Sequence, residues 1–280
     1  MATREPPNRM NRLALPSTVS CVSKCGLIEQ KHFKDNLAQV ILGSRTYIHK
    51  KHVSADEDLL FSAELRAYTL CNLRSPHVID FIGYTTDEDD KVDGMLLEFC
   101  PKYDLMRHLR KVGHCDWKFK MKWAAQITHG LMEIHRVGVT HGDLRAENVV
   151  LDDKLDAKII DIVLGWGFMF GWNPWRFPES EDIYKPHWDI YSLGVTLWEI
   201  ATDGKTPAEN QTPSFEPSIL ENDVAMRIAS VARKCLSDCP EDRPTAEAVL
   251  NELGGLDICG CKTERSDNGC NIYTDSIGKG

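Results

Sequence analysis

The chain has 280 residues, of which 42% are hydrophobic and 27% are charged, and its formal net charge is −9. The negative charge excludes a general nucleic-acid-binding surface, because a polyanion needs a basic field. No apolar run approaches the roughly 18 residues that cross a bilayer, and the N-terminus lacks a signal-type apolar segment. We therefore expect a cytoplasmic protein that does not bind membranes.

Both ends of the chain are expected to be flexible. Residues 1–25 are rich in Pro, Arg, Asn and Ser without periodicity, and residues 255–280 are polar and Gly-rich. The ten cysteines do not form paired C-x-x-C motifs of the kind that bind zinc. We expect them to be reduced thiols.

Residues 26–97 predict a small lobe that contains a sheet and one helix. Strand-like stretches occupy residues 38–42, 45–53, 77–86 and 94–100. Between the second and the third lies a helical stretch, residues 56–73. Its apolar residues are spaced to form one face of a helix: Leu59, Leu60, Ala63, Ala67 and Leu70.

Residues 104–254 predict a larger and mainly helical lobe, joined to the first by a connector at 98–103. Helical patterns cover residues 104–112, 117–138 and 187–204. Two short apolar runs, "NVVL" and "AKII", predict a two-stranded ribbon between the second and third helices. The expected fold class is α+β, with two lobes and a cleft between them where a ligand would bind.

The stretch "HGDLRAENVVLDDKLDAKIIDIVLGWG", which begins at His141, carries the polar groups of a candidate site. Asp143 is followed five residues later by Asn148 and eighteen residues later by Asp161. Oxygen ligands of this kind suit a Mg²⁺ ion whose remaining ligands are phosphate and water. Asn148 and Asp161 would bind the metal, and Asp143 would remain free to orient a hydroxyl. The alternative is that Asp and Asn are here simply as turn formers.

The order of the surrounding motifs resembles the eukaryotic protein kinase family over residues 27–253. "HGDLRAEN" resembles the catalytic loop H-R-D-L-x-x-x-N, "IIDIV" stands where the family has D-F-G, and "FPE" at 177–179 stands for A-P-E. "MLLEFCPKYDL" resembles the hinge, and "CLSDCPEDRPTAEAVL" the closing helix, whose Arg243 would pair with Glu179. "DLRAEN" and "LGVTLWEIATDG" are closest to the tyrosine-kinase and tyrosine-kinase-like group.

The resemblance implies ATP and Mg²⁺ as cofactors, a protein substrate, and a role for each site residue. Asp143 would be the catalytic base, Arg145 would offset charge near the transferred phosphate, and Asn148 and Asp161 would hold the metal. Lys50 of "TYIHKKHV", paired with Glu64, would bind the α- and β-phosphates. In the hinge, Leu97 would line the adenine pocket, and residues from Glu98 to Cys100 would offer backbone groups to the base.

Three departures from the family pattern favour an alternative, a pseudokinase that binds or scaffolds without turnover. The region "CGLIEQKHFKDNLAQVILG" has glycine only at its ends, where a glycine-rich loop would close over phosphates. Val163 replaces the D-F-G glycine, and Gly142 replaces the arginine of H-R-D. A small-molecule acceptor also remains open.

The stretch between Asp161 and Glu179 contains no Ser, Thr or Tyr. We therefore expect that phosphorylation of this segment does not activate the protein. The segment instead carries five aromatic residues within positions 166–175: Trp166, Phe168, Phe170, Trp172 and Trp175. They either pack the segment onto the large lobe or form a patch for a protein partner.

Overall fold

The computed structural model describes residues 15–53, 58–71, 75–162, 185–207, 211–255, 263–264 and 272–273. The aromatic segment, Val163 and the pairing of Arg243 with Glu179 lie outside these ranges or involve residues outside them. None of the described helices is long and apolar enough to cross a membrane. Six cysteines of the described ranges are free thiols: Cys21, Cys25, Cys100, Cys115, Cys235 and Cys239.

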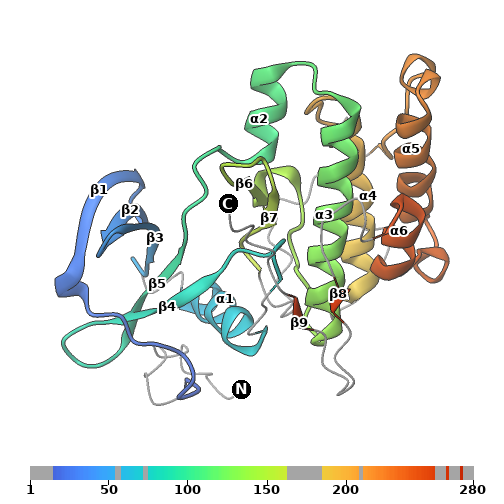
Figure 1. The fold of residues 1–280 in the computed structure, drawn as a ribbon. Coiled ribbons are helices and arrows are strands. Elements are labelled where there is room, and N and C mark those ends of the chain that lie inside the picture. The colour runs from blue at the N-terminus through green and yellow to red at the C-terminus, as the bar shows by residue number, and fades with distance from the viewer. Residues whose placement is uncertain are drawn as a thin grey trace.

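The first lobe is a five-stranded antiparallel sheet accompanied by one helix, α1 (Asp58–Cys71) (Figure 1). The strand order is β1-β2-β3-β5-β4. The strands are β1 (Leu27–Lys34), β2 (Leu37–Leu42), β3 (Arg45–Lys51), β4 (Phe81–Thr86) and β5 (Val92–Glu98). The expected small lobe with one main helix is confirmed, and β1 is a strand that the sequence pattern did not predict.

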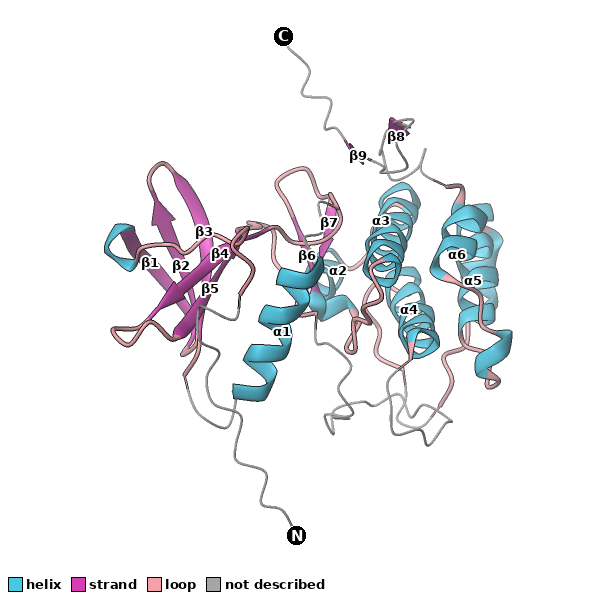
Figure 2. Cartoon of the chain, turned by 90° about the horizontal axis from the view of Figure 1, so that it is seen from below, coloured by secondary structure: helices cyan, strands magenta, loops and turns pink. Residues whose placement is uncertain are grey.

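The second lobe is helical and lies beside the sheet in both views (Figure 1, Figure 2). The ribbon of β6 (Val149–Leu151) and β7 (Ala157–Ile159) lies between the sheet and the longer helices. The helices are α2 (Leu105–Val112), α3 (Trp117–Arg136), α4 (Pro186–Ala201), α5 (Asp223–Cys235) and α6 (Ala246–Leu253). The two-lobed α+β architecture is thus confirmed, with α5 as an unpredicted helix.

The helix boundaries follow from local side-chain chemistry. Asp104 caps the start of α2 by accepting a hydrogen bond from the N–H of Arg107 at 2.7 Å, and Thr245 caps α6 in the same way through Ala248. Gly113 and Gly254 end these two helices in the left-handed conformation, which glycine adopts without steric strain. The caps fix where each helix begins and ends.

One apolar core runs through both lobes. It joins Leu65 of α1, Met95 of β5, Ile127 of α3 and Leu197 of α4, each fully buried. The lobes are also linked by backbone pairing, because Ile159 of β7 donates to the carbonyl of His77 and accepts from the N–H of Ile79, both at 2.9 Å. The ribbon that carries the candidate site is therefore anchored to the first lobe.

The expected N-terminal arm, residues 1–25, is corrected in its last part. Residues 20–22 lie along the free edge of β4: Val22 donates to the carbonyl of Tyr84 at 2.7 Å, and Tyr84 donates to that of Ser20 at 3.0 Å. Gly83 permits this approach, since a Cβ there would lie 2.4 Å from the carbonyl oxygen of Ser20. Residues 20–22 are held because the backbone groups of β4 would otherwise form an unpaired sheet edge.

We expect Gly83→Val to displace residues 20–22 from the edge of β4. The added side chain would overlap the carbonyl of Ser20 and the side chain of Val22, and the free energy of unfolding should fall by about 1–3 kcal/mol. Urea unfolding measures the loss, and limited trypsin digestion should cut faster after Lys24. An unchanged digestion rate would show that this contact does not hold the arm.

Candidate active site at the junction of the lobes

Three charged residues that are far apart in the sequence meet where β3, α1 and the end of β7 come together. The ammonium of Lys50 lies 2.7 Å from a carboxylate oxygen of Glu64 and 2.8 Å from one of Asp161. The Glu64 side chain is 6% exposed, that of Lys50 19% and that of Asp161 39%. Asp161 is thus the member of this charged cluster that faces solvent most.

The charges within the cluster shift each other's protonation. Burial alone would lower the pKa of Lys50, but the carboxylates of Glu64 and Asp161 outweigh it and raise this pKa above its usual value. Burial raises the pKa of Asp161, yet Lys50 more than compensates and the pKa is lowered. Burial raises the pKa of Glu64 to about 7 against the opposing effect of Lys50. Lys50 is a cation and Asp161 an anion at neutral pH.

Tyr68 holds the backbone of Asp161 in place and was missed from the sequence. It lies one turn after Glu64 on α1, so both side chains share one face of the helix. Its hydroxyl accepts a hydrogen bond from the N–H of Asp161 at 3.2 Å, and its ring stacks on Phe81. Asp161 has a φ of 58°, in the left-handed region that Asp tolerates better than most residues.

The second group is the loop between α3 and β6. Asn148 donates from its amide to a carboxylate oxygen and to the carbonyl of Asp143, both at 2.8 Å. The Asp143 side chain is 50% exposed, and the Nε of Arg145 lies 3.7 Å from its carboxylate. Asp143 is therefore oriented from one side and open to solvent on the other.

His141 connects the two groups. Its Nδ1 accepts a hydrogen bond from the N–H of Asp143 at 3.1 Å, which assigns the ring proton to Nε2, and Nε2 donates to the carbonyl of Ile160 at 3.0 Å. Burial lowers the pKa of this fully buried histidine. A neutral imidazole thus spans from the residue before Asp161 to Asp143.

Asp189 of α4 anchors the loop and was also missed from the sequence. Its carboxylate, which is fully buried, accepts hydrogen bonds from the N–H groups of His141 at 2.7 Å and Gly142 at 3.0 Å, and from His135 at 2.8 Å. Burial alone would raise its pKa, but the contacts with His135 outweigh burial and lower it. Gly142 has a φ of 86°, so the residue that replaces the family's arginine suits this turn.

Glu199, at the other end of α4, is a second buried carboxyl beside the same loop. It is 2% exposed and accepts a hydrogen bond from the N–H of Ala146 at 3.2 Å. Burial, reinforced by the negative charge of Glu147, raises its pKa to about 8. Asp189 and Glu199 are the only two carboxylates of α4, a mostly apolar helix. Acidic residues at buried positions of such a helix are the sequence signal that could have identified both.

We expect the stability of the fold to decrease as the pH rises through about 8 because of Glu199. Its carboxyl binds the proton more tightly in the folded chain than in the unfolded chain, where the pKa is near 4.5. This contribution is complete below pH 4.5 and is lost as the pH rises through about 8. Glu199→Gln should therefore match the wild type at pH 4.5 and exceed its free energy of unfolding at pH 9.

Urea unfolding between pH 4.5 and 9 measures this difference. The matched control is Glu252→Gln, which removes a carboxylate whose ion pair with Lys234 is exposed and should change stability little. A Glu199→Gln profile that runs parallel to the wild-type profile would refute the assignment.

The expected hinge residues lie on β5 and just after it. Leu97 is 5% exposed and pairs with Ile48 of β3, which shares the face of Lys50 two residues away. The carboxylate of Glu98 is bound to Lys158 of β7 at 2.7 and 2.8 Å, and its N–H donates to the carbonyl of Asp80. The backbone N–H of Glu98 therefore already has an acceptor and is not free to bind a base. Burial and the charge of Glu98 raise the pKa of Cys100 to about 12.

The hairpin of β1 and β2 occupies the place along the chain where a glycine-rich loop was expected. Its turn is formed by residues 35–36, and no glycine occurs from residue 27 to residue 42. Most of β1 is exposed. The hairpin thus has the position of a phosphate-covering loop without the backbone freedom that glycine gives.

Comparison with known protein families decides the relationship. The family described as "Protein kinase domain" matches residues 46–253, about three quarters of the chain. The chain belongs to this family. The resemblance predicted from the motifs is therefore confirmed, and so is the kinase-like fold.

Individual relatives are distant. A "Probable serine/threonine-protein kinase" of Dictyostelium discoideum is 28% identical over 242 residues, which are 77% of this chain and 39% of that protein. "Serine/threonine/tyrosine-protein kinase HT1" of Arabidopsis thaliana is 25% identical, over 75% of this chain and 58% of its own length. "Guanylate cyclase 2G" of Rattus norvegicus is 23% identical, over 89% of this chain and 26% of its own. The chain thus spans about two fifths of the first of these relatives.

Proposed function

We propose that this protein is an ATP-dependent protein kinase, which transfers the γ-phosphoryl group of ATP to a hydroxyl group of a protein. The observation that carries this proposal is the meeting of Lys50, Glu64 and Asp161, residues from three separate elements, beside the Asp143 loop. Phosphoryl transfer depends mostly on positioning and on charge neutralisation, and these groups supply both.

In this proposal Lys50, held by Glu64, binds the α- and β-phosphates, and Leu97 lies against the adenine with Glu98 and Cys100 beside it. The described residues contain no group of three or more His, Cys, Asp or Glu that could hold a metal ion alone. Mg²⁺ fits nevertheless, because it needs only one or two protein oxygens when phosphates complete its sphere. Asp161 and Asn148 would provide these oxygens, and the bound ion would neutralise charge on the phosphates.

Asp143 is proposed as the base that accepts the proton of the substrate hydroxyl. Its carboxylate is half exposed and is oriented by the amide of Asn148, so a hydroxyl could approach it from solvent. Arg145, 3.7 Å away, would place positive charge near the transferred group. The acceptor type, the substrate and a cytoplasmic location remain predictions.

A pseudokinase remains the second candidate because of one specific observation, the β1–β2 hairpin without glycine. The match to a protein named guanylate cyclase agrees with the general point that one fold hosts several functions. In this reading the domain binds a protein partner, with the aromatic segment at 166–175 as the proposed surface. A small-molecule acceptor would use the same site residues.

Transfer of radioactive γ-phosphate from ATP to the chain itself and to a mixed Ser, Thr and Tyr peptide pool tests the proposal. Asp143→Ala should lower the rate about 10²- to 10⁴-fold, the usual contribution of a positioned base. Asp153→Asn, an exposed change in the nearby ribbon turn, should leave the rate unchanged. Absence of transfer by the wild type would favour the pseudokinase.

Phosphatase treatment of the protein should not alter its activity, since the segment between Asp161 and Glu179 has no hydroxyl residue that could carry an activating phosphate.

A further inference from the structure

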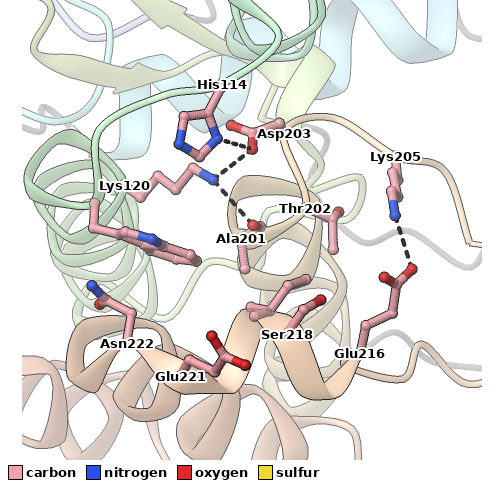
Figure 3. A pocket seen from close by; sticks show the side chains of 12 residues that line it. His114, Lys120, Ala201, Thr202, Asp203, Lys205, Glu216, Ser218, Glu221 and Asn222 are labelled. Carbon is pink, nitrogen blue, oxygen red and sulfur yellow. Dashed lines mark hydrogen bonds and ion pairs between the residues drawn. The ribbon is translucent and has the colours of Figure 1, made fainter.

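A cavity of about 420 Å³ lies in the helical lobe, and none of its lining residues belongs to the Lys50 cluster or to the Asp143 loop (Figure 3). Its walls come from the loop before α3, the start of α3, the end of α4, the 3-10 helix η5 (Pro217–Glu221) and the residue after it. The volume lies in the lower part of the range of ligand pockets. A site of this size accommodates one side chain of a partner more readily than a large cofactor.

Two lysine–carboxylate pairs in the cavity wall are neutral within themselves, and Nδ1 of His114 lies 3.6 Å from the Asp203 carboxylate of the first pair. Lys120 is 1% exposed, and its ammonium donates to Asp203 at 2.8 Å and to the carbonyl of Ala201 at 3.1 Å. Lys205 lies 2.9 Å from Glu216 at the rim. Figure 3 shows both pairs as dashed contacts. Because the Lys120 ammonium is buried and is already paired with the Asp203 carboxylate, it is a poor partner for an incoming anion.

The charge left over in the cavity is one carboxylate. Glu221 is exposed at the end of η5, and its carboxylate makes no hydrogen bond or ion pair with the described residues. Trp117 and Ile219, both partly buried, also line the cavity. Lys120 lies over one face of the Trp117 ring at 4.3 Å, so an incoming cation would stack on the opposite face of the indole. An uncompensated carboxylate together with an indole and an apolar side chain favours a cation on an apolar stem.

We propose that this cavity binds an arginine side chain presented by a protein partner. The guanidinium is planar, so it can stack on an indole and can donate two hydrogen bonds to one carboxylate, while its methylenes contact Ile219. The site is separate from the kinase reaction, and its occupancy can be measured in a protein that carries Lys50→Met.

Calorimetric titration of the full chain with N-acetyl-arginine amide tests this inference. N-acetyl-citrulline amide is the uncharged isostere and N-acetyl-glutamate amide the anionic control. Arginine amide should bind at least about five times more tightly than citrulline amide. Glu221→Gln should abolish that preference, whereas Lys205→Gln, which leaves Glu216 uncompensated, should strengthen it. Trp117→Leu should weaken the binding of both the arginine amide and the citrulline amide.

Several results would overturn the proposal: no binding of arginine amide, equal binding of arginine and citrulline amides, or unchanged arginine affinity in Glu221→Gln. Preference for glutamate amide would mean an anion site. The source of the arginine is tested with Arg12→Gln and Arg265→Gln, one change at each end of the chain. Tighter binding of the probe to either variant would show that the chain's own arginine occupies the cavity, not a partner.

Discussion

Asp189→Ala is expected to lower the free energy of unfolding by about 3–5 kcal/mol, the loss typical of a broken buried charge pair. The carboxylate accepts hydrogen bonds from the N–H groups of His141 and Gly142 and from His135. Alanine would leave these three donors without this acceptor, and the N–H of His141 is fully buried. Because two of these donors belong to the loop that holds Asp143, phosphotransfer should fall as well.

Urea unfolding measures this loss against Thr196→Val, a change in the same helix. Thr196 is also fully buried, but its hydroxyl donates only to the carbonyl of Ser192 one turn earlier, so its removal should cost less than about 1.5 kcal/mol. Similar losses for the two variants would mean that Asp189 is one buried polar group among others and does not anchor the loop.

Lys50→Met is expected to reduce phosphotransfer at least about 100-fold, as removal of a positioned charged donor does elsewhere. Methionine is close in size to lysine, so the packing of β3 is retained, while Glu64 and Asp161 lose their shared cation. The pKa of Glu64, already raised by burial, should rise further, and the protein should stay folded because the neutral carboxyl avoids a buried charge.

The matched control is Lys51→Met, the next residue along the strand. Lys51 points to the opposite face of β3 and pairs with Glu29 of β1. Phosphotransfer should be within about twofold of wild type, since exposed ion pairs contribute little. A larger loss in Lys51→Met than in Lys50→Met would show that the register of the lysine motif is shifted by one residue.

The motif order was sufficient to predict some of the contacts within the candidate site. The catalytic-loop pattern predicted Asp143 and Asn148 side by side, and the lysine motif predicted the partner of Glu64. These predictions depend on spacings within motifs or on the known layout of a family. Lobe composition was predicted for the same reason, because periodicities of two and of 3.6 residues differ clearly on either side of the connector.

The supports of the site could not be predicted in the same way, because they depend on tertiary contacts. Nothing in the local sequence of Asp189 shows that it faces the backbone of His141, 48 positions away. The hydroxyl of Tyr68 reaches the N–H of Asp161 across 93 positions. Buried polar groups need partners, so an isolated acid in an apolar helix indicates that such a contact exists without naming it.

Two of the elements that the sequence did not predict, β1 and α5, were missed for different reasons. β1 is mostly charged and exposed, so its strand character comes from pairing with β2 and not from alternation. α5 does carry the helical spacing, with buried Ala225, Ile228, Ala229, Ala232 and Cys235, and a periodicity count over residues 223–235 would have found it. The terminal arm was predicted from composition alone, which cannot register an open sheet edge.

The central claim is that the Lys50, Glu64 and Asp161 cluster binds a nucleotide, and equilibrium binding of ATP with Mg²⁺ tests it most directly. Thermal unfolding and calorimetry of the wild type should show binding, with about 2.7 kcal/mol of added stability at ATP concentrations 100 times the dissociation constant. Lys50→Met and Asp161→Asn should each bind at least about tenfold more weakly, and Lys51→Met should bind like the wild type. No binding by the wild type at millimolar ATP, or equal binding by all four proteins, would contradict the account.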